Sequence, residues 1–349
     1  MKKLFLSLVC CTALIFASCS DDDDKTPEVK EKTTAKEFIE KNRESAKQEI
    51  EVNASELPKT FTFKEKVKIT IPADALLKDG TPITGKFTLE VYEMLRPASI
   101  VLSGTNTNLM PAYRRYLETD GFIYVNVKQN GNYIDAKLGK NLTIAIPTDK
   151  EDGAETMLWT GVENAGPEEN QFSWQVLNDD DIIRDDNDGE FPNQDFNTVF
   201  ANNGHFEFSF GKLGWCNCDF PWGDGKELTT VTVELTGKVG KLASYLGGSG
   251  DTFVFFAGKG YPVVVQLYTD EYGGLATMAE STKTIVKSYN NSMPVGVQGK
   301  MFAFSIQEGI FAYASQDITI SKDMEMTLDL KEVSSSDLTN KLKDLDGYK

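Results

Sequence analysis

The sequence predicts an all-β protein with two β-sandwich domains in tandem, an N-terminal tether, and short helices at both ends. In many short segments, apolar residues stand at every second position, which is the pattern of half-buried strands. Gly, Asn, Asp and Pro separate these segments at regular intervals, as in the turns of a β-sandwich. Apolar residues make up 40% of the chain, and this share can form cores without a disulfide framework.

The N-terminus has the features of an export signal. Lys2 and Lys3 precede the apolar run Leu4–Phe16, which is shorter than the roughly 20 residues of a membrane-spanning helix. Ala17-Ser18-Cys19 then resembles the lipobox of bacterial lipoproteins. The resemblance implies that residues 1–18 are a signal peptide and that Cys19 carries the lipids, in place of any transmembrane helix. The alternative is an ordinary signal peptide with an incidental cysteine.

An acidic run follows the cysteine directly. Asp21–Asp24 resembles the export signal that sends Bacteroidetes lipoproteins to the outer face of the outer membrane. Four adjacent carboxylates also repel one another and stay solvated, so a plain spacer on the periplasmic side is the alternative. We expect a lipid-anchored outer-membrane protein exposed at the cell surface, and we assign residues 19–55 to a lipidated tether and a short helix.

The tether ends in a segment of helix-forming composition. Between Thr33 and about Ile50, Phe38 and Ile39 stand among alanines and charged residues. The apolar stripe is thin, so a helix packed on the body and a marginal, solvated helix both fit it.

The sequence pattern of residues 56–158 predicts the N-terminal β-sandwich. Apolar and polar residues alternate in 67–71, and Pro72 ends that strand. The turn residues Lys78–Pro82 lead to a second alternating strand, 87–91. Further strands are predicted at Phe122–Lys128 and Leu142–Ile146, with a turn at Gln129–Asn132 and the short run Tyr133–Leu138 between them.

This region resembles a ZU5-like β-sandwich module. The resemblance covers about a third of the chain and is one of strands and turns, so it implies a fold and a role in protein interaction but no catalytic residue. The later part also resembles poorly characterised surface lipoproteins of the same bacteria. The matching segments are Ile69–Leu76 and Gly85–Val91 for the module, and Gly121–Val125 and Ile144–Thr148 for the lipoproteins.

Residues 159–225 predict an acidic connector that ends in a strand. Phe206, Phe208 and Phe210 alternate with polar residues and lead into Gly214–Asp219. The pattern Gly-Trp-x-Asn-x-Asp in that segment resembles a recurrent signature of the same uncharacterised lipoproteins. Pro221–Gly225 interrupts the chain, and we place a domain boundary there.

Residues 226–332 predict the C-terminal β-sandwich and 333–349 a terminal helix or tail. Leu338, Leu342 and Leu345 form one stripe after Ser334–Ser336, which can cap a helix. The run Val263–Val265 indicates a strand buried on both faces. Strands are predicted at Leu228–Leu235, Phe253–Phe256, Val263–Leu267, Met301–Ile306, Ile318–Ile320 and Met324–Leu330.

The charge balance excludes one class of partner. The chain has 36 Lys and Arg against 53 Asp and Glu, a net charge of −17. Nucleic acid is not expected as a partner, since its binding depends on basic side chains over phosphates. The expected partners are the outer membrane, through the lipid anchor, and a glycan or a protein.

An acidic loop is the candidate metal site. Asp185, Asp186, Asp188 and Glu190 are clustered carboxylates of the kind that suits the hard cation Ca²⁺. Arg184 stands where an EF-hand needs its first ligand, so the site would be of a looser type. The alternative is a solvated acidic loop, and no other cofactor is expected.

Two cysteines remain in the folded part, Cys216 and Cys218. A C-x-C pair on a strand points both thiols to one face, and we interpret them as small buried structural thiols beside Trp215. A redox-active pair and a strained disulfide are alternatives. A zinc site would need two more ligands, and His205 is the only histidine.

Aromatic residues near turns are the candidate ligand site. Trp159, Trp174, Trp222 and Tyr272, if exposed, would stack on sugar rings; the alternative is packing in a core. We expect no catalytic residue: Gly80–Lys86 resembles a phosphate loop, but Phe87 replaces the Ser or Thr that such a loop needs.

These observations predict a lipid-anchored cell-surface lipoprotein with a non-catalytic binding or structural role, such as glycan or protein capture. A carboxylate-based glycan hydrolase is the first alternative; the 53 acidic residues form many pairs, but this abundance is not evidence for a particular site. An accessory subunit of an outer-membrane uptake complex is the second.

Overall fold

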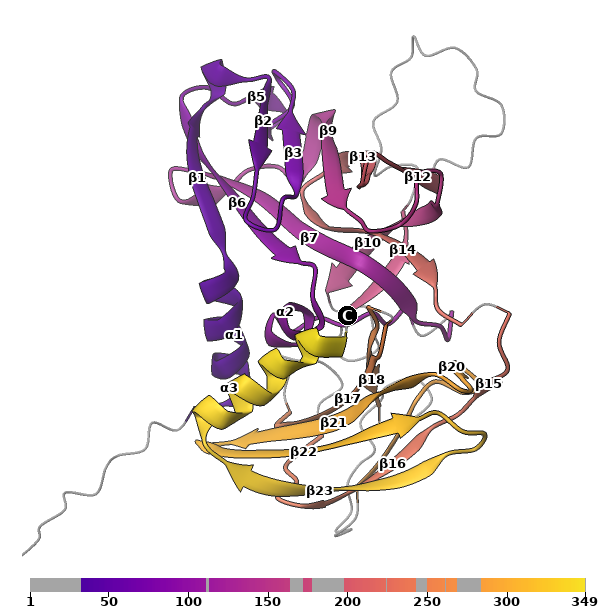
Figure 1. The fold of residues 1–349 in the computed structure, drawn as a ribbon. Coiled ribbons are helices and arrows are strands. Elements are labelled where there is room, and N and C mark those ends of the chain that lie inside the picture. Colours follow the sequence, from indigo (N-terminus) through magenta and orange to yellow (C-terminus); the bar gives the residue numbers. More distant parts are fainter. Residues whose placement is uncertain are drawn as a thin grey trace, which may run out of the picture. The chain divides into compact units, whose positions relative to one another are not determined.

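The computed structural model describes residues 33–110, 113–163, 172–177, 198–223, 225–242, 250–260, 262–268 and 284–348. Residues 32–349 form one compact unit. The described chain is mostly β-strand, arranged in large sheets, which confirms the predicted all-β class (Figure 1). A division of these sheets into two separate β-sandwich domains is not confirmed.

The first large sheet contains the strands between residues 48 and 221. Every pairing along its main path is antiparallel, and the path starts and ends with two strands that are neighbours in sequence. The short turn η1, Ala54–Glu56, joins these two end strands. In sheet order the strands are β1 Gln48–Asn53, β6 Lys86–Met94, β7 Leu117–Gln129, β14 Gly214–Pro221, β10 Glu155–Glu163, β12 Thr198–Asn202, β13 His205–Lys212, β9 Lys137–Pro147, β3 Lys68–Ile71 and β2 Lys59–Thr62. Beside the path, β8 Asn132–Tyr133 pairs with β7 and β11 Phe172–Val176 with β10, and β4 Leu77–Lys78 with β5 Thr81–Pro82 forms a separate hairpin.

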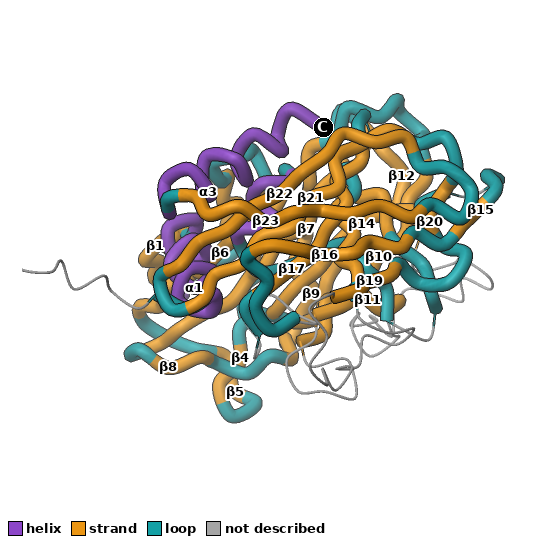
Figure 2. Tube along the Cα trace, turned by 90° about the horizontal axis from the view of Figure 1, so that it is seen from below, coloured by secondary structure: helices purple, strands orange, loops and turns teal. Residues whose placement is uncertain are grey.

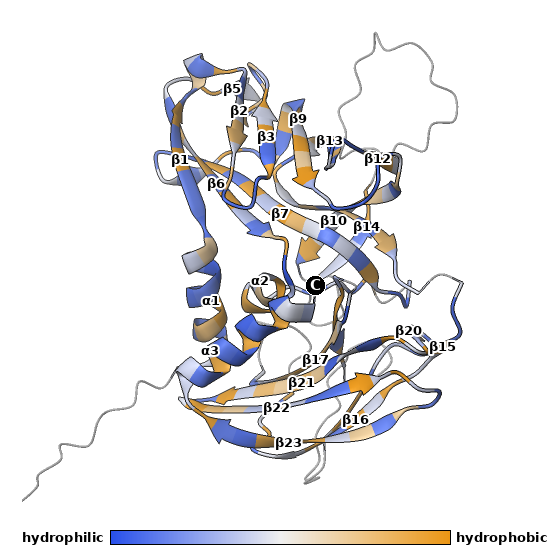
Figure 3. Ribbon diagram, viewed as in Figure 1, coloured by the Kyte–Doolittle hydropathy of each residue, from blue (hydrophilic) through white to orange (hydrophobic). Residues whose placement is uncertain are grey.

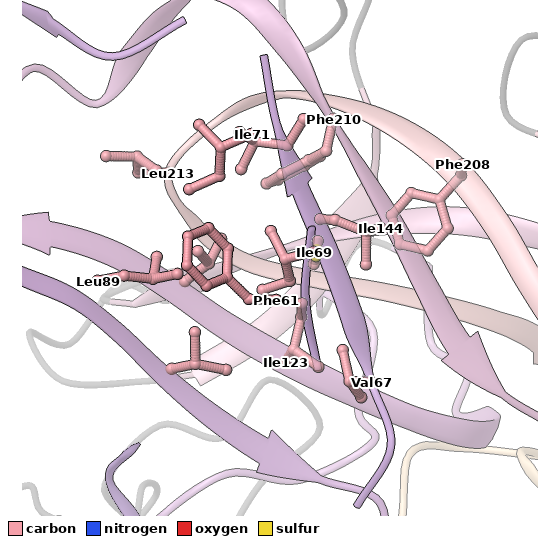
Figure 4. Close-up of a cluster of buried hydrophobic side chains, with 14 of the residues drawn as sticks. Phe61, Val67, Ile69, Ile71, Leu89, Ile123, Ile144, Phe208, Phe210 and Leu213 are labelled. Atoms are coloured by element: carbon pink, nitrogen blue, oxygen red, sulfur yellow. The ribbon is translucent and has the colours of Figure 1, made fainter. Parts of the chain in front are cut away.

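The alternation in the sequence has a direct structural counterpart in this sheet. One face of its strands is apolar and forms a buried cluster (Figure 4), because successive side chains of a strand point to opposite faces. Phe208 and Phe210 of β13 lie in this cluster with Ile69 of β3 and Ile144 of β9. The predicted strands of residues 56–158 therefore share one core.

Two predictions for this part were wrong in detail. The expected helix extended to Ile50, but Gln48–Asn53 is the edge strand β1. The expected acidic connector contains strands: β10 lies between β14 and β12, well inside the sheet. Thr156, Leu158 and Thr160 of β10 are buried, and the Thr residues interrupt the apolar alternation that would have revealed a strand.

The second large sheet contains seven strands from the C-terminal part. The pairing of β16 with β23 is parallel, and the other pairings are antiparallel. Its two end strands approach each other through a bridge between Tyr268 and Lys287. In sheet order the strands are β18 Val264–Leu267, β17 Thr252–Gly258, β21 Gln298–Gln307, β22 Ile310–Thr319, β23 Glu325–Val333, β16 Thr232–Gly237 and β19 Thr284–Lys287 (Figure 1 for β18 to β16, Figure 2 for β19). The short strands β15 Leu228–Thr229 and β20 Met293–Pro294 form a separate pair.

Helices are present at both ends of the described chain, as predicted. The helix α1, Ala35–Ala46, begins with a capping box in which Thr34 and Glu37 satisfy each other's backbone N–H groups. The helix α3, Ser335–Lys343, is capped by Ser334 and continues into the turn η3, Asp344–Tyr348. Both helices have one apolar and one polar side (Figure 3). A third helix, α2 at Pro97–Leu102, was not predicted.

A shared apolar layer joins the two sheets and the helices. It combines the face of the first sheet that points away from its own core with the outward face of β17, β21 and β22. Phe38 of α1 and Leu338 of α3 also contribute to it. This layer explains why residues 32–349 behave as one unit. Its large members are Phe38, Tyr92, Phe122, Trp159, Phe172, Trp174, Trp215, Phe253, Phe255, Phe302, Phe304, Phe311 and Tyr313.

The loop after α2 adds polar contacts between the sheets. Thr107 N–H donates to the Val264 carbonyl at 2.9 Å, and the Asn108 side chain pairs with both backbone groups of Gln266. Since β18 is an end strand of its sheet, these contacts satisfy backbone groups that would otherwise be unpaired.

The C-terminal turn η3 caps α2 from a distance of 248 residues in sequence. Arg96, at the helix start, provides no side-chain cap, and Asp346 Oδ1 instead accepts from Ala98 N–H at 3.0 Å. We expect Asp346→Ala to lower the free energy of unfolding by about 1 kcal/mol, as for other lost caps. Urea denaturation measures this, with Asp344→Ala on the same turn as the control; equal losses in the two variants would contradict the capping role.

Candidate functional site

A β-bulge lies in β7, opposite the strand that carries the Gly-Trp-x-Asn-x-Asp pattern. In the pairing of β14 with β7, Asn217 lies opposite Phe122 and Asp219 opposite Thr119, so β7 has one residue more than β14 in this interval. Gly121 stands in the bulge with φ +123°, and a Cβ there would collide with Leu95. Bulges often redirect side chains towards sites, which makes this region a candidate.

The two cysteines of this strand face the core of the first sheet. Cys216 and Cys218 are both buried free thiols, and both belong to the same apolar cluster. Burial raises the pKa of each thiol well above its usual range. The thiolate is the reactive form, so this environment disfavours redox or nucleophilic chemistry and suits a packing role.

On the opposite face of β14, Asn217 and Asp219 form a buried polar cluster with Thr119 of β7. The Asn217 amide donates to Asp219 Oδ2, and the Thr119 hydroxyl donates to Asn217 Oδ1 at 3.3 Å. Asp219 is only 1% exposed, and its Oδ1 has no hydrogen bond of normal geometry from the described residues. Burial raises the pKa of Asp219 well above its usual value, although Thr119 and Asn217 oppose this. The cluster therefore favours a neutral carboxylic acid inside the protein.

The surroundings of Asp219 are closed. Trp159 Nε1 donates to the Asp219 carbonyl at 2.9 Å, and the Thr119 N–H donates to the Pro262 carbonyl at 3.0 Å. Next to the cluster, Lys150 Nζ lies 3.1 Å from Glu118 Oε1. A buried acid so enclosed contributes to the folding of the bulge rather than to contact with an external substrate.

The predicted aromatic platform is not present at three of its four positions. Trp159, Trp174 and Trp222 are 3%, 0% and 1% exposed, so none of them presents a ring face to solvent. Trp174 and Trp159 belong to the shared apolar layer, and Trp222 lies in the core of the second sheet. The alternative of packing in a core therefore holds for these three residues, because the nearby turn residues do not bring the rings themselves to the surface. Tyr272 lies outside the described residues.

Other predicted sites fall outside the described residues as well. These are the lipidation site Cys19 and the calcium candidates Asp185, Asp186, Asp188 and Glu190. Within the described ranges, no three His, Cys, Asp or Glu side chains gather in a geometry that could hold a metal. The segment Gly80–Lys86 contains the short strand β5 and the first residue of β6, so it leads into a strand and lacks the helix of a phosphate loop.

An open cavity of about 400 Å³ lies where three strands of the second sheet meet the C-terminal turn. The residue after β17, the start of β21 and the end of β22 line it, and η3 forms another wall. A hollow in which polar groups from several segments meet is a candidate ligand site. The lining residues are Lys259, Gln298, Gly299, Asp317, Ile318, Thr319, Gly347 and Tyr348.

Strand pairing positions these lining residues. Gly299 pairs with Gly258 on one side and Ile318 on the other, and Lys259 N–H donates to the Gln298 carbonyl at 2.8 Å. A Cβ at Gly299 would collide with the Phe256 ring and the Ala257 carbonyl. Glycine at this position lets the Phe256 ring pack directly against the strand.

Tyr348 is held in place at the cavity by three contacts. Its hydroxyl hydrogen-bonds with Asp317, its carbonyl accepts from Gly260 N–H at 2.8 Å, and Lys300 Nζ lies 5.2 Å from its ring centroid. Burial and the neighbouring Asp317 carboxylate raise the pKa of Tyr348 to about 12. The phenol therefore stays protonated and remains a hydrogen-bond donor at neutral pH.

Sequence reasoning missed this cavity. Its residues come from three segments, around 259, 298 and 317, and from the terminal pair Gly347 and Tyr348. No local spacing connects them. The one available signal was Tyr348 itself, an aromatic residue beyond the last leucine of the predicted terminal helix.

Comparison with protein-family models, with curated proteins and with solved structures gave no significant match. Among the described residues, no helix combines the length and the apolar character needed to cross a membrane.

Proposed function

We propose that this chain is a lipid-anchored outer-membrane lipoprotein, exposed at the cell surface, that binds a ligand without transforming it. The observation that carries the binding role is the open cavity at the C-terminal turn, with its mixed polar and aromatic lining. The lipobox-like Ala17-Ser18-Cys19 and the run Asp21–Asp24 support the location. Two β-sandwich units, the first of them ZU5-like, remain our interpretation of the sheets, and such modules suit a role in interaction.

The start of the fold is consistent with this anchor. The capping box of Thr34 and Glu37 begins α1 at Ala35, so residues 20–34 separate the lipidated cysteine from the first helix in the sequence. Acyl chains contribute about 0.8 kcal/mol per buried CH₂, and two or three chains hold a protein at a membrane without a spanning helix.

The lining of the cavity favours binding over hydrolysis. A glycoside hydrolase places two carboxyl groups about 5–9.5 Å apart around the bond that it cleaves. Among the described lining residues Asp317 is the one carboxylate. The other notable acid, Asp219 of β14, is buried and does not line this cavity.

The anchor is tested with Cys19→Ser in the full chain. We expect this variant to leave the membrane fraction, because the thioether that attaches the lipid needs the Cys19 sulfur. Cys11→Ser, within the predicted signal peptide, is the matched control and should stay in the membrane. Immunoblots of separated fractions give the result, and retention of Cys19→Ser in the membrane would refute the lipid anchor.

The binding role is tested by thermal unfolding of the full chain with panels of polysaccharides and peptides. A ligand that binds only the native state stabilises it by about 2.7 kcal/mol at a hundredfold excess over its Kd. Chromatography of the same mixtures shows whether products form. Stabilisation without products supports the proposal, and release of products would replace it with an enzymatic function.

A further inference from the structure

We propose that the cavity at the C-terminal turn is a subsite for one or two residues of a neutral saccharide, with Tyr348 as the surface on which a sugar ring rests. This inference builds on the proposed binding role and specifies the chemistry of its ligand. It depends on the size of the cavity, on the charges of its lining, and on the way in which Tyr348 is held.

The size of the cavity limits the ligand to a small group. At about 400 Å³, it lies near the lower end of ligand pockets, which range from about 300 to 1,000 Å³. One or two sugar rings fit such a volume. A longer chain would continue out of the cavity into solvent.

The charges of the lining favour a neutral ligand with many hydroxyl groups. Lys259 offers donors, Asp317 offers acceptors, and the Gln298 side chain offers both. An anionic ligand would meet the Asp317 carboxylate, and a cationic ligand would meet the Lys259 ammonium. A hydroxyl group both donates and accepts, so a polyhydroxylated molecule can satisfy the whole set.

Tyr348 supplies the apolar surface of the site. The hydrogen bond with Asp317 and the Lys300 ammonium near its ring fix the side chain before any ligand arrives. Little rotamer freedom is then lost on binding, which favours affinity. The side chain remains partly exposed. An aromatic ring is apolar over its faces, and the C–H groups of a sugar ring can pack on it.

The chain contains a matched tyrosine outside the cavity. The Tyr133 hydroxyl donates to Glu90 Oε1 at 3.3 Å, and Lys128 Nζ lies 4.7 Å from the Tyr133 ring centroid. Tyr133 is 53% exposed, so it is a tyrosine with the same two types of partner but without the cavity. Comparing the two positions separates the effect of the site from that of an exposed tyrosine.

The experiment is isothermal titration calorimetry on the full chain in a detergent without sugar groups. The probes are glucose, galactose, mannose, N-acetylglucosamine, maltose, cellobiose and lactose. We expect at least one probe to bind, and Tyr348→Ala to weaken its affinity by about tenfold or more, equivalent to ~1.4 kcal/mol. Tyr133→Ala should leave the affinity within about twofold of the unmodified chain.

Circular dichroism shows whether Tyr348→Ala folds. If it does not fold, two milder variants test the site instead. Tyr348→Phe keeps the ring and removes the hydroxyl, and Asp317→Asn removes the acceptor charge. Each should weaken binding by about two- to fivefold. Unchanged affinity in both of these variants would overturn the assignment of the site.

Other results separate this inference from the proposed function. If none of the saccharide probes binds while a peptide stabilises the chain, the saccharide subsite is wrong and the binding role stands. If saccharides bind and are cleaved, the subsite stands and the non-catalytic role is wrong. Equal weakening by Tyr133→Ala and Tyr348→Ala would also overturn the subsite.

Discussion

Replacing Trp174 with alanine is expected to lower the free energy of unfolding by about 4 kcal/mol, the largest loss that we anticipate for one side chain. Its indole is completely buried, with the rings of Phe122 and Phe172 at centroid distances of 4.7 and 5.1 Å. Its Nε1–H also donates to the Asn106 carbonyl at 2.8 Å. Alanine would leave a cavity in the shared apolar layer and an unpaired carbonyl group beside it.

Equilibrium unfolding in urea measures this loss of stability, and two further variants serve as comparisons for it. Trp174→Phe keeps most of the apolar volume but not the hydrogen bond, so we expect a loss of about 1–2 kcal/mol. Phe200→Ala removes an exposed aromatic ring of β12 and should change stability by less than about 0.5 kcal/mol. If Trp174→Ala resembled Phe200→Ala, the indole would be a surface group, as the aromatic-platform hypothesis required.

Asp219 is expected to make the protein less stable as pH rises. Its pKa in the folded state is raised by burial, whereas in the unfolded chain it returns to about 3.9. The folded state then binds a proton that the unfolded state releases. The stability from this group is complete below pH ~4 and falls by about 1.4 kcal/mol per pH unit until the folded-state pKa is reached.

Asp219→Asn isolates this effect, because the amide is similar in shape and does not ionise. The difference in unfolding free energy between the variant and the unmodified chain should shift in favour of the variant as pH rises from 4 to 6, by at most about 1.4 kcal/mol per pH unit. Glu207→Gln, on the exposed side of β13, controls for the change in net charge. A difference for Asp219→Asn that stays constant across this range would show that Asp219 is ionised in the folded protein.

Strands could be predicted where apolar and polar residues alternate in the sequence. Other elements were missed where this alternation is interrupted. Phe206, Phe208 and Phe210 stand on one face of β13, and their spacing predicted this. The helix α2 is short and buried over Pro97, Ala98, Ile100 and Val101, so it has no polar stripe to reveal its period. The spacing of apolar residues distinguishes a helix from a strand only when one face of the element is exposed to water.

Residue spacing could not predict the sites, because they depend on contacts between distant segments. The pattern around Asp219 was visible, but the bulge that encloses it arises from pairing with Thr119–Gly121. Turn residues near Trp222 suggested exposure, whereas the stacked Phe256 ring, at a centroid distance of 5.9 Å, keeps it buried. The cavity at Tyr348 likewise required the sheet register to be known.

The shared apolar layer has a consequence for how such a chain can evolve. A β-domain that is transferred between proteins by recombination has a complete hydrophobic core of its own, and its outer surface can be exposed to water. Here each sheet covers an apolar face of the other, with Phe122 and Trp215 on one side and Phe255 and Phe304 on the other. Transfer or duplication of one sheet alone would leave such a face open, which favours aggregation. Recombination between the two halves is thereby disfavoured, and we expect lineages that keep one half to keep both.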